Sequence, residues 1–136
     1  MRGLYLITND DPLEVLLAKL EGAFANGGIA VLQYRRKKVT KEDQIYEVEY
    51  MKALCAEYAV PFVINDDLEM AVKYGVGVHL GQDDGSIADA AAQLPQGVLI
   101  GCSCNNSLEL AEQAIAEGAN YVAFGAIYAT DTKPEA

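Results

Sequence analysis

The sequence contains few residues of several kinds, and each shortage excludes a class of protein. Its 136 residues include no tryptophan, one histidine and three cysteines, Cys55, Cys102 and Cys104. Three cysteines with no second closely spaced pair form neither a zinc knuckle nor the disulfide framework of a small secreted domain. A reducing, cytoplasmic setting is therefore the expected one.

Positive charge and long apolar runs are scarce as well. Ten Lys and Arg stand against twenty Asp and Glu, for a formal net charge of −10. Nucleic acids and anionic membranes bind basic faces, so we expect neither as a partner. No run of about 18 apolar residues occurs, and the N-terminus lacks the apolar region and cleavage site of a signal peptide. Walker and Gly-x-Gly-x-x-Gly motifs are also absent.

Hydrophobic residues make up 51% of the chain, enough for a core, and the length predicts a single domain over residues 1–136. Short apolar runs alternate with amphipathic segments. We expect strands at 3–8, 29–34, 60–65, 76–80, 97–101 and 120–125. We expect helices from 12 to about 25, from 40 to about 58, over 67–74, from Ser86, and from 106 or Ser107 to 118.

This alternation of buried strands and helices predicts an α/β fold with a parallel sheet and right-handed crossovers. Two architectures remain open at this point, a doubly wound open sheet and a (β/α)8 barrel. A barrel has eight strands, so six strands correspond either to an incomplete barrel or to an open sheet.

Basic residues gather behind the second expected strand, where five of the ten lie between positions 35 and 41. Alternation along an extended segment places Gln33, Arg35 and Lys37 on one side. The Arg fork matches phosphate oxygens, and Lys adds a point charge. The segment therefore indicates an anion site, with a solvated basic loop paired with surface acids as the alternative.

Carboxylates follow the next two strands. Asp66 and Asp84 end neighbouring strands, and two carboxylates beside an anionic substrate are a usual way to hold Mg²⁺. The alternative is that these acids only cap helices, which is the stronger interpretation for Asp67 and Asp83. Cations and carboxylates converging on one edge of the sheet together predict a diphosphate–metal site.

Three further features carry weaker signals. The segment Thr130-Asp131-Thr132-Lys133 could bind another phosphate, although an ordinary polar loop is the preferred interpretation from these residues alone. Ser103 has no base near it in the sequence, so we do not expect a serine nucleophile. His79 lies within an apolar strand, where we expect a packed or hydrogen-bonded core residue rather than a ligand.

The motifs GLYLIT, QYRRK, INDD, GVHLGQDD, IGCS and YVAFGAIYATDTKP, in this order, resemble the thiamine-phosphate synthase family from residue 3 to residue 134. The resemblance implies a TIM barrel that joins a hydroxymethylpyrimidine diphosphate to a thiazole phosphate and releases diphosphate, so that its partners are small phosphorylated molecules. It implies pyrimidine-diphosphate contacts from Gln33, Arg35, Lys37, Asn65, Ser103 and Lys133. It also implies thiazole-phosphate contacts from Thr130, Asp131 and Thr132, and Mg²⁺ ligands in Asp66 and Asp84.

The chain departs from the family pattern in several places. The family's barrel has two more strands after the sixth, so the favoured interpretation is part of a longer chain, with a degenerate short product as the alternative. Asn105 stands where the family often has His, which counts against the related thiazole tautomerase. An inactive phosphate-binding relative is the other functional interpretation. Open strand edges also make a homo-oligomer an expectation.

Overall fold

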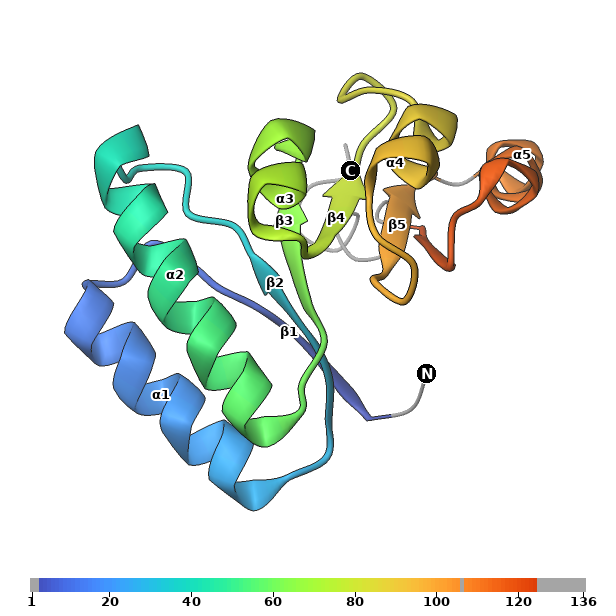
Figure 1. Cartoon of the computed structure of the whole chain (residues 1–136). Helices are drawn as coiled ribbons and strands as arrows, with labels where there is room; N and C mark the ends of the chain where they lie inside the picture. Colours follow the sequence, from blue (N-terminus) through green and yellow to red (C-terminus); the bar gives the residue numbers. More distant parts are fainter. Residues whose placement is uncertain (1–2, 106, 125–136) are drawn as a thin grey trace.

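The computed structural model describes residues 3–105 and 107–124, which fold into parallel strands alternating with helices (Figure 1). The strands are β1 (Leu4–Ile7), β2 (Ile29–Tyr34), β3 (Phe62–Asn65), β4 (Gly77–Leu80), β5 (Ile100–Ser103) and β6 (Tyr121–Ala123). The helices are α1 (Leu13–Asn26), α2 (Lys41–Tyr58), α3 (Leu68–Tyr74), α4 (Ile87–Gln93) and α5 (Leu108–Glu117). In the part of the chain so described, none of the helices has the length and apolar character to cross a membrane.

The order of the strands decides between the two architectures. Each strand pairs in parallel with the next along the chain, from β1 through β6. A doubly wound sheet reverses its order at a switch point, whereas a barrel keeps the strands in sequence. The sheet also curls, since its first and last described strands come together: the hydroxyls of Tyr5 on β1 and Tyr121 on β6 lie 2.5 Å apart. The fold is a curled half-barrel of the TIM type, and the doubly wound alternative is wrong.

The two faces of the sheet have different compositions. Alternate side chains of the strands, such as Leu32, Ile64 and Val78, belong to the hydrophobic core that α1 to α5 also line. The intervening positions carry polar and aromatic groups, including Gln33 and His79, and these face the inside of the curl. The core therefore lies between sheet and helices, which leaves the inner face free to form a site.

Helix starts follow the expected chemistry. Side chains of Thr40, Ser86 and Ser107, which lie at the predicted helix starts, each accept a hydrogen bond from the backbone N–H three residues on. Asp67 does the same for α3, with its carboxylate accepting from the N–H of Met70 at 3.0 Å. These caps fix where each helix leaves the loop that follows a strand.

The position of the fifth strand differs from the prediction. We expected residues 97–101, but β5 covers Ile100–Ser103. Gly97 has a φ of 96°, in the left-handed region, and belongs to a turn, so the apolar residues after it lead into the strand rather than forming it. As a result Ser103 is the last residue of the strand instead of a loop residue.

Candidate functional site

One cavity of about 870 Å³ opens at the carboxyl ends of the strands. All of the predicted site residues that the structure describes line it, namely Gln33, Arg35, Lys37, Asn65, Asp66, Asp84 and Ser103. They come from four strands or the loops that directly follow them, as expected for a parallel α/β fold. Thr130, Asp131, Thr132 and Lys133 lie outside the described residues.

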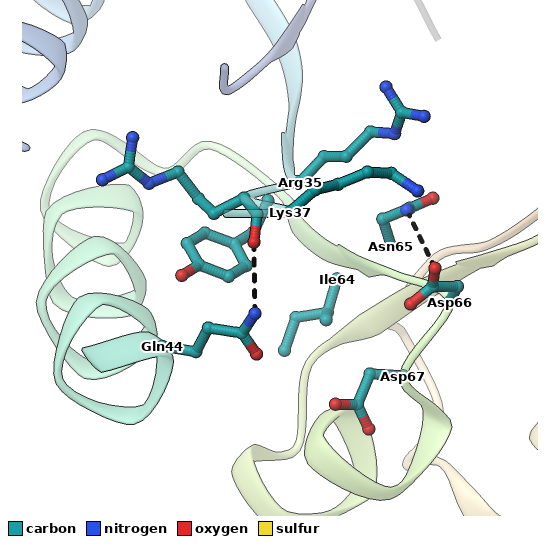
Figure 2. Close-up of a pocket in the computed structure, with 9 residues that line it drawn as sticks. Arg35, Lys37, Gln44, Ile64, Asn65, Asp66 and Asp67 are labelled. Carbon is teal, nitrogen blue, oxygen red and sulfur yellow. Dashed lines mark hydrogen bonds between the residues drawn. The ribbon is translucent and has the colours of Figure 1, made fainter. Parts of the chain in front are cut away.

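The loop after β2 brings two cations to this cavity. Figure 2 shows Arg35 and Lys37 extended in the same direction, toward the side on which Asn65 and Asp66 lie. Among the residues that the structure describes, neither cation makes an ion pair. Surface pairing is instead seen for Lys41, whose Nζ lies 2.7 Å from Asp67 Oδ2. The alternative of a basic loop neutralised by surface acids therefore fits Lys41 but not the two cations at the cavity.

A smaller cavity of about 300 Å³ adjoins these residues on the side of α2 (Figure 2). Arg35, Lys37, Asn65 and Asp66 line both cavities. The four side chains thus form a polar boundary that is accessible from two directions.

Arg36, between the two cations, points away from the larger cavity. Its guanidinium is buried and pairs with Glu47 of α2, with Nε 3.0 Å from Oε1. The hydrogen bond to Glu47 raises the pKa of Arg36 above its usual value. The alternation expected from the sequence is therefore observed, with Arg35 and Lys37 on one side and Arg36 on the other.

The two carboxylates are held by backbone geometry. Asp66 has a φ of 54°, a left-handed conformation that Asp tolerates better than most residues, and its N–H donates to the His79 carbonyl at 2.7 Å. Asp84 Oδ2 accepts the N–H of Gly81 at 2.7 Å. A Cβ at Gly81 would lie 2.9 Å from that same oxygen, so glycine allows the carboxylate to approach its backbone closely.

The protonation of Asp66 depends on its burial and on the charges around it. Burial raises the pKa of Asp66 first, and the charge of Asp84 raises it further. The cations Lys37 and Arg35 act in the opposite direction. Carboxylates and cations therefore share one electrostatic environment at the mouth of the cavity.

A metal would find only part of its coordination shell here. Within residues 3–105 and 107–124 no group of three or more His, Cys, Asp or Glu could hold a metal ion. Zinc needs three or four protein ligands, whereas Mg²⁺ takes one or two carboxylates and completes its shell with water and substrate phosphate. A cation beside Asp66 and Asp84 would also offset the burial and the repulsion that raise the pKa of Asp66. The pair therefore fits Mg²⁺ better than zinc.

A chain of hydrogen bonds that the sequence did not predict crosses the inside of the half-barrel. Gln33 Nε2 donates to the Tyr5 hydroxyl at 2.7 Å, and that hydroxyl contacts the one of Tyr121. The Tyr121 hydroxyl lies 3.0 Å from His79 Nδ1, and His79 Nε2 lies 2.7 Å from Ser103 Oγ. The chain joins β2, β1, β6, β4 and β5, and its members line the cavity.

His79 is a buried, hydrogen-bonded residue, as expected, but it also belongs to the cavity wall. Burial lowers the pKa of its imidazole to about 4, so the ring is neutral at neutral pH. Ser103 has no base near it in the sequence, but in the structure His79 approaches it from the adjacent strand. Sequence distance concealed the contact, since the two residues are 24 positions apart.

Tyr5 and Tyr121 were not predicted as site residues, because each has the sequence context of an ordinary aromatic residue in a strand. The signal that could have found them is glycine at position 101, which pairs with Tyr121 in the sheet register. A Cβ at Gly101 would overlap the Tyr121 ring, so the absence of a side chain allows this ring to lie across β5 and reach His79 on β4.

Comparison with known proteins agrees with this geometry. The family model described as Thiamine monophosphate synthase matches residues 4–136. A solved thiamine phosphate pyrophosphorylase from Pyrococcus furiosus is similar with a TM-score of 0.74 and 29% sequence identity. The match covers 88% of this chain and 58% of that protein, so the chain spans less than two-thirds of its relative. The chain belongs to the thiamine monophosphate synthase family, as its motifs predicted.

Proposed function

We propose that this chain carries the diphosphate half of a thiamine-phosphate synthase site. The reaction joins 4-amino-5-hydroxymethyl-2-methylpyrimidine diphosphate to a thiazole phosphate and releases diphosphate. The observation that carries the proposal is the cavity that Arg35 and Lys37 share with Asp66 and Asp84. Cations and carboxylates at one cavity mouth suit a diphosphate bound together with a metal, which neither set alone would indicate.

In the proposed reaction the bond between the pyrimidine methylene carbon and the diphosphate oxygen breaks. A bond forms between that carbon and the thiazole nitrogen, while the bonding electron pair leaves with the diphosphate. Negative charge therefore grows on the leaving group, where Arg35 and Lys37 would stabilise it more strongly than in the bound substrate. No covalent intermediate with the protein is needed, so positioning and electrostatics supply the catalysis.

Asp66 and Asp84 would hold Mg²⁺, which when bound neutralises charge on the diphosphate oxygens. Asn65 lies beside this pair, and its amide Nδ2 donates to Asp66 Oδ2 at 3.4 Å. Because the pKa of Asp66 is raised, a positive charge beside it would stabilise its ionised form. A divalent ion and the two cations would then surround the diphosphate from different strands.

The pyrimidine ring would lie deeper, against the hydrogen-bond chain. An aminopyrimidine carries both donors and acceptors, and the chain offers an amide in Gln33, hydroxyls and a neutral imidazole in His79. A neutral His79 suits this task, because a protonated ring would repel the cation-like methylene. The thiazole-phosphate contacts of Thr130, Asp131 and Thr132, and the diphosphate contact of Lys133, remain predictions from the family resemblance.

The test is product formation by the purified protein. Incubation with both phosphorylated substrates and Mg²⁺ should yield thiamine phosphate and diphosphate, and removal of Mg²⁺ with a chelator should stop it. Binding of the pyrimidine diphosphate without product from this chain, but with product from a version extended by two βα units, would agree with a half site. Binding without product from either version would support the alternative of a phosphate-binding relative that does not catalyse the transfer. Failure to bind the pyrimidine diphosphate at all would contradict the proposal.

A further inference from the structure

We propose that Arg36 and Glu47 are positioning residues for the diphosphate site, because their buried ion pair fixes the loop that presents Arg35 and Lys37. The inference rests on the proposed function, since it gives the pair a role in binding only if those two cations bind diphosphate. Neither Arg36 nor Glu47 lines the larger cavity, and Arg36 reaches only the smaller one on the side of α2. Its guanidinium is already bonded to Glu47 and to two carbonyl groups, so we expect its effect on diphosphate binding to act through the loop.

Arg36 links three separate segments of the chain. Its Nε and Nη2 donate to the two carboxylate oxygens of Glu47 on α2, both at 3.0 Å. Its Nη1 donates to the carbonyl oxygens of Asn9 and Asp11, at 2.8 and 2.5 Å, in the loop between β1 and α1. The side chains of Arg36 and Glu47 are only 4% and 5% exposed. One guanidinium therefore ties the loop after β2 to the loop after β1 and to α2.

Neighbouring bonds leave the pair little freedom. The Tyr34 hydroxyl donates to Glu47 Oε1 at 2.7 Å, and Gln44 Nε2 donates to the Arg36 carbonyl at 3.1 Å. Thus α2 holds both the side chain and the backbone of Arg36. A bidentate fork between planar groups also restricts orientation more than a single contact does.

The same loop is held on either side of Arg36. The N–H of Arg35 donates to Thr8 Oγ1 at 2.7 Å, and the N–H of Lys38 donates to Asp10 Oδ1 at 3.1 Å. Arg36 points inward toward α2 while its neighbours Arg35 and Lys37 line the cavity, so holding Arg36 fixes the backbone from which both cations extend. The backbone is thereby set before any ligand arrives.

Stability alone is a weak explanation for this arrangement. Buried ion pairs stabilise the folded state little more, and often less, than apolar residues of the same volume, because both charges must be desolvated. The pair also places a third positive charge between two others, where repulsion opposes it. Orientation of the loop gives the pair a function that apolar side chains could not supply.

The test replaces the pair with apolar side chains in the double variant Arg36→Met, Glu47→Met. This change leaves the net charge unaltered, so long-range attraction of an anion is the same as in the original protein. The second variant, Arg36→Lys, keeps a charge for Glu47 but cannot reach both carbonyl groups as well. The matched control, Lys52→Met with Glu57→Met, also leaves the net charge unaltered, but it changes two exposed residues of α2 that take no part in these hydrogen bonds.

Two measurements are made on each folded variant: amide hydrogen exchange at Arg35 and Lys38, and binding of inorganic diphosphate with Mg²⁺ by calorimetry. We expect both test variants to exchange these two amides faster and to bind diphosphate about tenfold more weakly, the loss of roughly one charge-assisted contact. The control should match the original protein in both.

Unchanged exchange at Arg35 and Lys38 in both test variants would overturn the inference even if diphosphate binds. Faster exchange with unchanged affinity would overturn it too, because the loop would then be held without consequence for binding. If the original protein bound no diphosphate, the proposed function would fail, while the exchange rates would still show whether the pair holds the loop.

Discussion

Gly101 shows how a single residue shapes the inside of the half-barrel. The Tyr121 ring lies across this position, and an added Cβ would overlap it. We expect Gly101→Ala to displace the ring, break its contacts with His79 and Tyr5, and lower the free energy of unfolding by about 1–3 kcal/mol, the usual cost of overpacking. Denaturant unfolding followed by tyrosine fluorescence measures the change.

The matched control is Gly22→Ala in α1. Gly22 is helical and has nothing within 4 Å of an added Cβ, so alanine should stabilise the protein by about 0.5–1 kcal/mol through helix propensity. The same chemical change thus has opposite signs at the two positions. Equal stability of the Gly101→Ala variant and the original protein would show that the Tyr121 ring is not confined as described.

His79 makes stability depend on pH in a defined direction. Its pKa is lowered from 6.5 to about 4 in the folded protein, so between these values the unfolded chain binds more protons. Stability is therefore lost as the pH falls from about 6.5 to about 4, by up to about 3 kcal/mol for this one group. Urea unfolding at a series of pH values measures it.

The variant His79→Gln separates this effect from that of other groups. Asp66, whose pKa is raised, contributes in the opposite direction, but it is present in both proteins and cancels in their difference. We expect the original protein to lose stability relative to His79→Gln as the pH falls through this window. Parallel curves for the two proteins would contradict the buried, neutral state of the imidazole.

Sequence reasoning at the residue scale found the charged part of the site and missed its interior. Asp66 and Arg35 were identifiable because charged residues that directly follow apolar strands must lie at one edge of a parallel sheet. The Ser103–His79 contact was not, because it depends on which strands are neighbours and which side chains face inward. Tyr5 and Tyr121 were hidden for a related reason, since aromatic residues are common in any buried strand.

At the scale of elements, the basic residues of the loop from β2 to α2 have two roles: some face the cavity, and Arg36 holds the loop in place. Arg35 lines the cavity, and we expect Arg35→Ala to weaken diphosphate binding by about 1.5–3 kcal/mol, the value of a charge-assisted hydrogen bond. Calorimetric titration with inorganic diphosphate and Mg²⁺ measures the loss.

Lys38→Ala is the control for this prediction. It removes the same charge from the same loop, but Lys38 lines neither of the two cavities beside Arg35, and its backbone bond to Asp10 is preserved. Its effect should be limited to the weak long-range attraction that salt screens. Equal losses in the two variants would point to general charge rather than a specific contact at Arg35.

The bounds of elements were predictable where caps define them and less so elsewhere. Thr40 and Ser107 mark the starts of α2 and α5 because their hydroxyls satisfy backbone groups that the helix leaves free. The shift of β5 arose because Gly97 and the apolar residues after it look like the start of a strand. Apolar character alone cannot separate a strand from a half-buried approach to it.

At the scale of the whole molecule, the sequence could not choose between a barrel and an open sheet. Both bury their strands and alternate them with helices, so the apolar patterns are the same. The choice depends on strand order and curvature, which the contact between Tyr5 and Tyr121 makes visible at the two ends of the described sheet. Family motifs supplied what physical pattern alone left open.

The curl of the sheet gathers charges from separate strands at the mouth of the cavity, where we propose that they bind a magnesium–diphosphate complex. The most direct test titrates inorganic diphosphate into the protein with and without Mg²⁺, and repeats this for Asp66→Asn, Asp84→Asn and the control Asp83→Asn. Asn keeps the shape of each side chain and also tolerates the left-handed backbone at position 66.

We expect Mg²⁺ to strengthen diphosphate binding to the original protein and to Asp83→Asn, and to have little effect on the other two variants. Diphosphate affinity that is the same with and without Mg²⁺ in the original protein would contradict the claim. An Asp83→Asn variant as impaired as Asp84→Asn would contradict the assignment of Asp84.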